Sequence, residues 1–308
     1  MIKAQNLIKD YGELRAVDDV SFTITSGEIV GLLGLNGAGK TTLLRMLASL
    51  LTPTSGVVTV DGAELEADGE AVRQRIGFLP EIPPLYGEMT VANFLGFVAR
   101  LRKVPYDEAE GRVREVAERC QIGEVLHQHI DTLSFGYRKR VGIAQAIIHQ
   151  PPLVILDEPI AGLDPAQIVE MRELVKQLRG AHTVVLSSHI LAEISQTCDR
   201  ILVMHHGRIV AQGSESELGS QISKDQCINL QVRAAREVVS EMIRDYPGVL
   251  NLTVTHEGRG VVHLTVVSNR DIKEELSATI IKAGLGLRHL SSSEERLEEI
   301  FLSLTSTT

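Results

Sequence analysis

Short apolar runs alternate with longer stretches whose apolar positions lie three or four residues apart over the first two thirds of the chain. The short runs predict buried strands, and the spaced positions predict helices with one apolar face. The expected strands are Ile2–Ile8, Val17–Thr25, Glu28–Leu33, Gly56–Val60, Arg75–Leu79, Leu153–Leu156, Thr183–Ser187 and Arg200–Met204. The expected helices are Lys40–Ser49, Ala67–Gln74, Pro165–Leu178 and Leu191–Gln196. This alternation predicts an α/β domain around a parallel sheet with right-handed crossovers.

Between Pro80 and about Gln150 the period is almost wholly helical. Amphipathic helices are expected at Val91–Arg102, Tyr106–Cys120 and Arg138–His149. We interpret residues 82–150 as a helical insertion within the α/β domain. Further on, Val203–Gly213 is interrupted by His206-Gly207, which predicts a hairpin.

Beyond about residue 220 the pattern changes again. It predicts, in order, strand Gln226–Arg233, helix Ala234–Asp245, strands Val249–Thr255 and Val261–Val267, helix Asp271–Ala283 and strand Gly286–Leu290. The order βαββαβ is that of a small α+β, ferredoxin-like domain. We therefore expect two domains, residues 1–219 and 220–308.

A last helix is expected at Ser293–Ser303, and apolar residues recur there at helical spacing: Leu297, Ile300, Phe301 and Leu304. This stripe either joins two subunits or a membrane partner, or simply packs on its own sheet. The pattern favours neither. Binding of a small regulator by this domain is a third role, which rests on fold analogy alone. We therefore favour the assembly role over regulator binding.

Length, net charge and cysteine spacing disfavour several classes of protein. A length of 308 residues fits about two domains, and the net charge of -9 argues against a nucleic-acid binder, which usually carries a basic patch. The three cysteines are widely spaced and match no zinc or redox pattern, which fits a reducing compartment. No apolar run approaches the ~20 residues that span a bilayer, so we expect any membrane role to be exercised from the cytoplasmic side.

The most informative stretch joins the strand ending at Leu33 to the helix beginning near Lys40. It contains Gly34-x-x-x-x-Gly39-Lys40-Thr41, the complete phosphate-binding loop pattern. Its glycines permit tight turns that aim backbone N–H groups at phosphate oxygens, and the helix adds the positive end of its dipole. Lys40 would bridge the β- and γ-phosphates, and Thr41 would ligate Mg²⁺. A glycine-rich turn without a ligand is the weaker alternative.

Two carboxylates end a buried strand downstream, in Leu153-Val154-Ile155-Leu156-Asp157-Glu158. Acids are costly to bury without a partner, so this placement suggests a site at the sheet edge. Asp157 would hold Mg²⁺ and Glu158 would polarise the attacking water.

The third helix of the insertion is preceded by Leu133-Ser134-Phe135-Gly136-Tyr137. A serine hydroxyl and a glycine N–H at a helix start can bind an anion, but Ser134 can equally be an ordinary N-cap. This motif alone does not decide between the two.

Taken together, residues 2–218 resemble the nucleotide-binding subunit of the ATP-binding cassette (ABC) family. Gly34–Thr42, with Asn36, Gly37, Ala38 and Thr42 inside it, resembles Walker A, and Leu153–Glu158 resembles Walker B. Leu133–Tyr137 resembles the signature motif. The remaining matches are Ala161–Asp164 to the D-loop, His189 to the switch histidine and Tyr11, expected in the loop after the first strand, to the adenine-stacking aromatic. The resemblance implies a P-loop NTPase cassette fold that uses ATP and Mg²⁺.

The resemblance also implies a head-to-tail dimer with a second copy, in which Ser134 and Gly136 of one subunit, with Asp164 at the interface, close on the ATP held by Lys40 of the other. Two departures stand out. Phe135-Gly136-Tyr137 replaces the usual Gly-Gly-Gln, and Glu81 stands where the family has a glutamine that senses Mg²⁺ and the attacking water. A carboxylate at position 81 can still reach Mg²⁺ or water.

The turn at Phe78–Glu81, the C-terminal extension and the final Arg296–Leu302 stretch resemble the type-2 export branch, which includes gliding-motility and drug-export systems. The implied function is an ATPase at the cytoplasmic face of the membrane, powering a separate integral-membrane permease that Pro80–Arg102 would contact. The competing class is a soluble ABC ATPase acting on ribosomes or DNA. Such proteins normally carry two cassettes or a long coiled coil, and neither is evident here.

Overall fold

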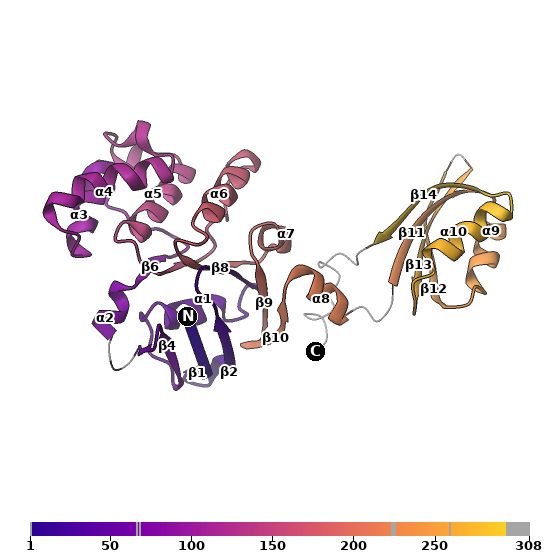
Figure 1. Cartoon of the computed structure of the whole chain (residues 1–308), viewed down its shortest axis with the longest axis horizontal. Coiled ribbons are helices and arrows are strands. Elements are labelled where there is room, and N and C mark those ends of the chain that lie inside the picture. The colour runs from indigo at the N-terminus through magenta and orange to yellow at the C-terminus, as the bar shows by residue number, and fades with distance from the viewer. Residues whose placement is uncertain (1, 66, 68, 223–225, 259, 294–308) are drawn as a thin grey trace. The chain divides into compact units, whose positions relative to one another are not determined.

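The structure is a computed structural model that describes residues 2–65, 67, 69–222, 226–258 and 260–293 (Figure 1). The chain forms two compact units, Met1–Ser214 and Glu215–Thr308. Among the residues described, no helix is both long enough and apolar enough to cross a membrane.

The centre of the first unit is a six-stranded sheet in the order β10-β9-β3-β8-β7-β6. Its strands are β3 (Ile29–Leu33), β6 (Ile76–Leu79), β7 (Leu153–Leu156), β8 (Thr183–Ser188), β9 (Arg200–His205) and β10 (Arg208–Gly213). The five strands from β9 to β6 pair in parallel, and β10 pairs with β9 as the antiparallel hairpin expected around His206-Gly207. Every residue of β3, β7 and β8 is buried, as expected of parallel strands covered on both faces.

A second, antiparallel sheet in the order β2-β1-β4-β5 packs with the helix α1 (Lys40–Leu47) in one apolar core. Its strands are β1 (Ile2–Tyr11), β2 (Leu14–Ile24), β4 (Ser55–Val60) and β5 (Ala63–Glu64), and the helix α2 (Gly69–Gln74) follows. The prediction that Tyr11 lies in a loop is wrong. Strand β1 continues past Ile8 through irregular pairing with β2, as far as the Tyr11–Leu14 pair.

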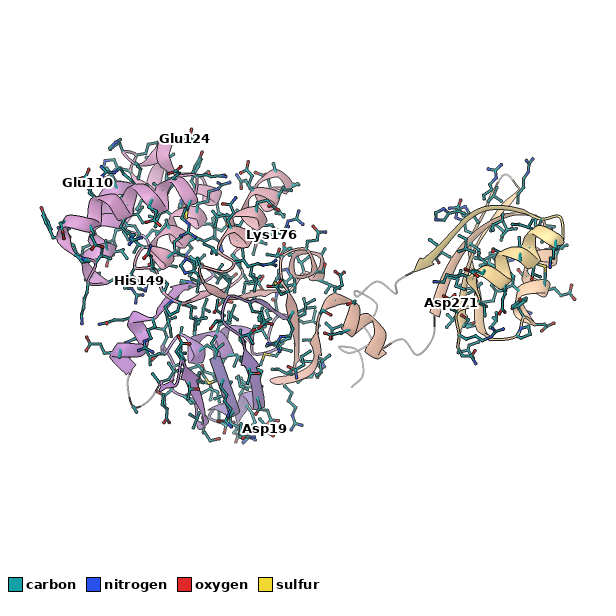
Figure 2. All side chains as sticks on the ribbon, viewed as in Figure 1. Asp19, Glu110, Glu124, His149, Lys176 and Asp271 are labelled. Carbon is teal, nitrogen blue, oxygen red and sulfur yellow. The ribbon has the colours of Figure 1, made fainter. Side chains whose placement is uncertain are left out.

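The helical insertion lies between β6 and β7 in the sequence, as expected. It comprises α3 (Val91–Leu101), α4 (Tyr106–Arg119), the 3₁₀ turns Gly123–Val125 and Ile130–Thr132, and α5 (Phe135–Ile147). Figure 2 places Glu110 and Glu124 on its outer part. The helix α5 begins three residues before the expected Arg138, because Ser134 is its N-cap and accepts a hydrogen bond from the Tyr137 N–H. Helices α6 (Pro165–Gln177) and α7 (Leu191–Ser195) flank β8 in sequence.

The second unit begins with α8 (Glu215–Ile222), so the boundary predicted near residue 220 falls within a helix. The elements that follow are β11 (Gln226–Arg233), α9 (Arg236–Arg244), β12 (Val249–Gly258), β13 (Val261–Ser268), α10 (Lys273–Lys282) and β14 (Gly286–Ser293). They form an antiparallel sheet in the order β12-β13-β11-β14. The βαββαβ prediction is therefore confirmed. The expected last helix, with Leu297, Ile300, Phe301 and Leu304, lies outside the described residues except for Ser293, which ends β14.

Candidate functional site

The loop between β3 and α1 has a shape that only glycine permits at two positions. Gly39 has φ 102°, and a Cβ there would lie 2.2 Å from the Ala16 carbonyl oxygen. A Cβ on Gly34 would lie 2.6 Å from the Met204 carbonyl oxygen. Because Gly39 is the N-cap of α1, the first N–H groups of this helix lie next to the loop and lack intrahelical acceptors. The loop can therefore cradle an anion against backbone donors.

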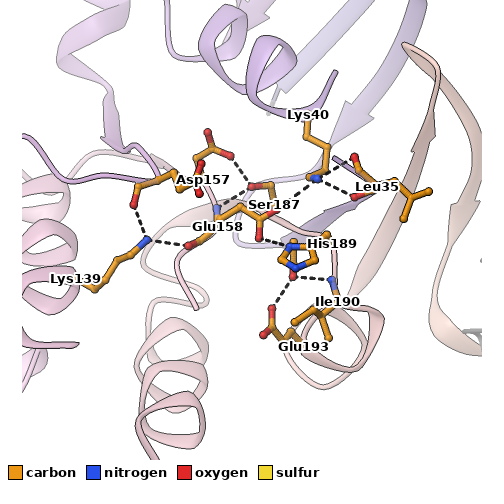
Figure 3. Close-up of polar contacts among 12 residues, drawn as sticks. Leu35, Lys40, Lys139, Asp157, Glu158, Ser187, His189, Ile190 and Glu193 are labelled. Carbon is orange, nitrogen blue, oxygen red and sulfur yellow. Dashed lines mark hydrogen bonds and ion pairs between the residues drawn. The ribbon is translucent and has the colours of Figure 1, made fainter. Parts of the chain in front are cut away.

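Lys40 is buried at the start of α1 although it carries a charge. Its Nζ donates to the Gly34 carbonyl oxygen at 2.7 Å and to the Leu35 carbonyl oxygen at 3.3 Å. It also lies 3.4 Å from Glu158 Oε1. These contacts hold the ammonium group over the loop, where it can face phosphate oxygens (Figure 3).

Asp157 and Glu158 leave the carboxyl end of β7 and are both buried. The Ser187 hydroxyl at the neighbouring end of β8 joins them: it donates to Asp157 Oδ1 at 2.7 Å and accepts from the Glu158 N–H at 2.8 Å (Figure 3). Glu158 adopts φ 47°, a left-handed conformation that residues other than glycine rarely use. One serine thus fixes one carboxylate and one strained backbone position.

The Glu158 side chain lies between a lysine and a histidine. Oε1 faces Lys40, and Oε2 is 3.0 Å from His189 Nδ1. His189 follows β8 directly, so β7 and β8 bring the carboxylate and the imidazole together at the same sheet edge. This arrangement can hold a carboxylate as a base at the mouth of the phosphate loop.

Lys139, on α5, reaches the same edge from the helical insertion and is completely buried. Its Nζ donates to the Glu81 carbonyl oxygen at 2.7 Å and to the Glu158 carbonyl oxygen at 2.9 Å. Burial lowers the pKa of Lys139 from its ordinary value, and the carboxylates of Glu81, Asp157 and Glu158 oppose that shift.

A cavity of about 370 Å³ opens over the loop, within the usual range for small-molecule sites. Its lining comprises Tyr11, Leu14, Ala16, Leu35, Asn36, Gly37, Gly39, Lys40, Thr41, Thr42, Glu81, Glu158, Ala161 and His189. Most of the predicted nucleotide-binding residues therefore surround one space. Gly34 and Ala38 shape the loop without lining the cavity, and Asp157 is linked to it through Ser187 and Glu158.

Three further predicted residues do not line this cavity and are not linked to it by these contacts: Ser134, Gly136 and Asp164. Ser134 is exposed and caps α5, while Gly136 is buried in the first turn of that helix, where a Cβ would lie 2.7 Å from Gln167 Oε1. Asp164 caps α6 by accepting from the Gln167 N–H at 2.9 Å. Ser134 therefore is the N-cap that the sequence allowed. Because the residue is also exposed, N-capping does not exclude a contact with an anion.

The sequence reasoning missed Lys139, Ser187 and Glu193. Glu193, on α7, is buried and accepts from the Ser188 hydroxyl at 2.5 Å, and burial raises the pKa of its carboxyl group. Figure 3 shows Glu193 near His189. The sequence offers one weak signal, and it concerns only the serines: Ser187 and Ser188 end a mainly apolar strand directly before His189.

Comparison with known proteins gives a consistent result. Residues 17–161 match the family model described as "ABC transporter". The chain is 34% identical to the linearmycin resistance ATP-binding protein LnrL of Bacillus subtilis, over 100% of this chain and 99% of that protein. It is 32% identical to the bacitracin transport ATP-binding protein BcrA of Bacillus licheniformis, over 99% and 97%. The dimeric post-hydrolysis structure of the ATP-binding cassette MJ0796 with ADP and Pi aligns at a TM-score of 0.64 and 26% identity, over 70% of this chain and 98% of that one.

Proposed function

This chain belongs to the ABC transporter family, and from that premise we propose that it is the ATP-hydrolysing subunit of an export system and powers a separate membrane permease. The observation that carries the proposal is Glu158, a buried carboxylate held between Lys40 and His189 on the wall of the cavity. The homologous resistance and transport proteins support the export role, because they match over almost the full chain.

ATP is the substrate of the cavity in this proposal. Its β- and γ-phosphates take the place of the Gly34 and Leu35 carbonyl oxygens and of Glu158 as partners of the Lys40 ammonium group. The N–H groups from Asn36 to Thr42 surround the phosphates. Tyr11, about half exposed at the cavity wall, stacks on the adenine.

The oxygen donors near the loop fit Mg²⁺, which prefers carboxylate and hydroxyl ligands and keeps several waters. Thr41, Asp157 and Glu81 would hold it, and bound there it would neutralise charge on the phosphates. Among the described residues no three His, Cys, Asp or Glu side chains form a complete metal site. This fits an ion that is held largely by phosphate and water.

Hydrolysis is assigned to Glu158 and His189. Glu158 accepts the proton of the attacking water through its carboxylate, whose Oε2 contacts His189, while Ser187 and Lys139 hold the Glu158 backbone. His189 fixes Oε2 and contacts the γ-phosphate. Glu81 lies at the same cavity and orients the water or the metal.

The second half of each site comes from another copy of the chain. Ser134 and Gly136 do not line the cavity of their own subunit, which is expected if they close on the ATP of a partner in a head-to-tail dimer. Asp164 takes part in that interface. Dimer closure on two nucleotides and reopening after hydrolysis would supply the motion that drives transport.

The permease contact is assigned to Pro80–Arg102. The large apolar side chains of Ile82, Tyr86 and Leu101 are exposed along this segment, as a docking surface requires. The subunit would then sit at the cytoplasmic face of the membrane. Action on nucleic acid is disfavoured by the net charge of -9, which repels a phosphate backbone.

Mixed dimers test the composite site. Ser134→Arg and Lys40→Ala are each expected to abolish turnover as homodimers, while the Ser134→Arg subunit still binds ATP. A mixed dimer of the two retains one intact Lys40–Ser134 pair, so partial ATPase activity is expected to return. A demonstrated mixed dimer without activity, assayed beside a mixed dimer of parent and Lys40→Ala that is active, would contradict the trans arrangement.

A further inference from the structure

Lys139 joins three segments that lie far apart in the sequence. It belongs to α5, five positions after Ser134, and its Nζ binds carbonyl oxygens in the turn after β6, at Glu81, and in the turn after β7, at Glu158. The Phe135 ring lies over the ammonium group, with its centroid 5.5 Å away. The helix that begins with Ser134 is therefore fastened to the two turns that carry the site's carboxylates.

This contact is expensive for the fold. A completely buried ammonium group loses its hydration, which destabilises the folded state unless partners replace the water. An apolar side chain of the same length would fill this space without that cost. The partners of Nζ are backbone carbonyls rather than a carboxylate, so they fix the path of the chain at Glu81 and Glu158.

The Glu158 backbone needs such fixing. Its left-handed φ of 47° is held from both sides, because its N–H donates to Ser187 and its carbonyl accepts from Lys139. Without the second contact the strained turn can relax, and the carboxylate moves away from Lys40 and His189.

We propose that Lys139 is a positioning residue that transmits the placement of α5 to Glu81 and Glu158. The inference rests on the proposed function: when Ser134 at the start of α5 closes on the partner's ATP, Lys139 sets the carboxylate of its own subunit for hydrolysis. In each subunit, α5 then links the partner's ATP, at Ser134, to the carboxylate of its own site, at Lys139.

Lys139→Met tests this, because methionine has a similar length and no donor. The expected result is a kcat about 10- to 100-fold lower, as for a misplaced catalytic group, with KM for ATP within about threefold of the parent. Lys139→Gln keeps two N–H donors without the charge and is expected to recover part of the loss. If Lys139→Met does not fold, Lys139→Gln is judged by the same split between kcat and KM.

Gln145→Met is the matched control. Gln145 also lies on α5, and its side-chain amide donates to a backbone carbonyl at Phe78 in β6 (2.9 Å) instead of to the Glu81 and Glu158 carbonyls. Its kcat is expected to stay within about twofold of the parent. An equal loss in both variants would show that general attachment of α5 matters, and would overturn the proposal, as would a parental kcat for Lys139→Met.

The Glu158→Gln background separates this inference from the proposed function. Lys139→Met/Glu158→Gln is expected to form an ATP-dependent dimer, measured by light scattering, as readily as Glu158→Gln alone. Loss of that dimer would place Lys139 in assembly and overturn a positioning role. Parental hydrolysis by Glu158→Gln alone would overturn the proposed base and this inference together, whereas failure of the Lys139 test leaves the base intact.

Discussion

The two units of this chain bury different kinds of side chain. In the first unit the buried set includes charged residues that contact one another or neighbouring backbone at the sheet edge: Lys40, Lys139, Asp157, Glu158 and Glu193. In the described part of the second unit the core is aliphatic, from Ile228 and Leu230 to Leu276 and Ile280. Ser268 is the one buried polar residue within that part.

Buried charges and buried aliphatic side chains serve different purposes in these two units. Replacing buried ion pairs by well-packed apolar residues is often neutral or stabilising, so the charges of the first unit are weak contributors to its stability. They are explained by what they position, namely a carboxylate between a lysine and a histidine beside a cavity. The described part of the second unit buries no charged side chain, and its core is apolar.

Glu158→Gln sharpens this contrast and has the largest expected effect. Hydrolysis is expected to fall about 10²- to 10⁴-fold, because the amide cannot accept a proton from water. ATP binding and the melting temperature are expected to stay near the parent values, since glutamine keeps the shape and a bond to His189. Steady-state hydrolysis, nucleotide binding and thermal unfolding measure the three quantities. Parental hydrolysis would mean that the buried charge serves the fold rather than the chemistry.

The same contrast explains what the sequence could predict. Strands buried on both faces, such as Leu153–Leu156, are continuous apolar runs, and the βαββαβ order of the second unit follows from simple alternation. Lys40, Asp157 and Glu158 were found because a loop pattern and a strand end mark them. The start of α5 and the end of β1 were misplaced, because a cap and an irregular pairing decided them.

Lys139 and Ser187 could not be predicted in the same way. Lys139 stands in an Arg-Lys-Arg run, which ordinarily faces solvent, and only the packing of α5 against turns 58 and 19 residues away buries it. Ser187 is an unremarkable strand residue until β7 and β8 pair and bring Asp157 to it. Their roles depend on long-range contacts that no local pattern encodes.

His149 gives the next largest effect, and it also belongs to the first unit (Figure 2). Burial, with Arg102 nearby, lowers its pKa to about 4, and its buried Nδ1 has no partner among the described residues. As pH falls below about 6.5, His149 becomes protonated in the unfolded chain but stays neutral in the folded chain. The free energy of unfolding that is present at neutral pH is therefore progressively lost toward pH 4. Between pH 7 and pH 5 this loss is about 2 kcal/mol.

His149→Gln is expected to reduce that pH dependence. The glutamine amide can still donate to the Ile76 carbonyl oxygen, which His149 Nε2 contacts at 3.3 Å, and it does not titrate. Urea unfolding at pH 7 and pH 5 measures the free energy of unfolding of both proteins. An unchanged pH dependence in the variant would contradict the assignment. His182, whose pKa burial also lowers, acts in the same direction and is left intact.

Deletion of residues 221–308 has the smallest expected effect on the nucleotide, and it tests whether the two interiors are functionally separate. The cavity is lined entirely by residues of the first unit, so the affinity for ATP is expected to stay within about twofold of the parent. Dimer formation or assembly with the permease is expected to weaken, because we favour an assembly role for the tail over binding of a regulator. Leu264→Ala in the full chain is the matched variant: removing this buried side chain costs about 2–5 kcal/mol within the second unit and should likewise spare ATP binding. If a folded truncated protein no longer binds ATP, the aliphatic unit contributes to the charged site, and the separation between the two interiors fails.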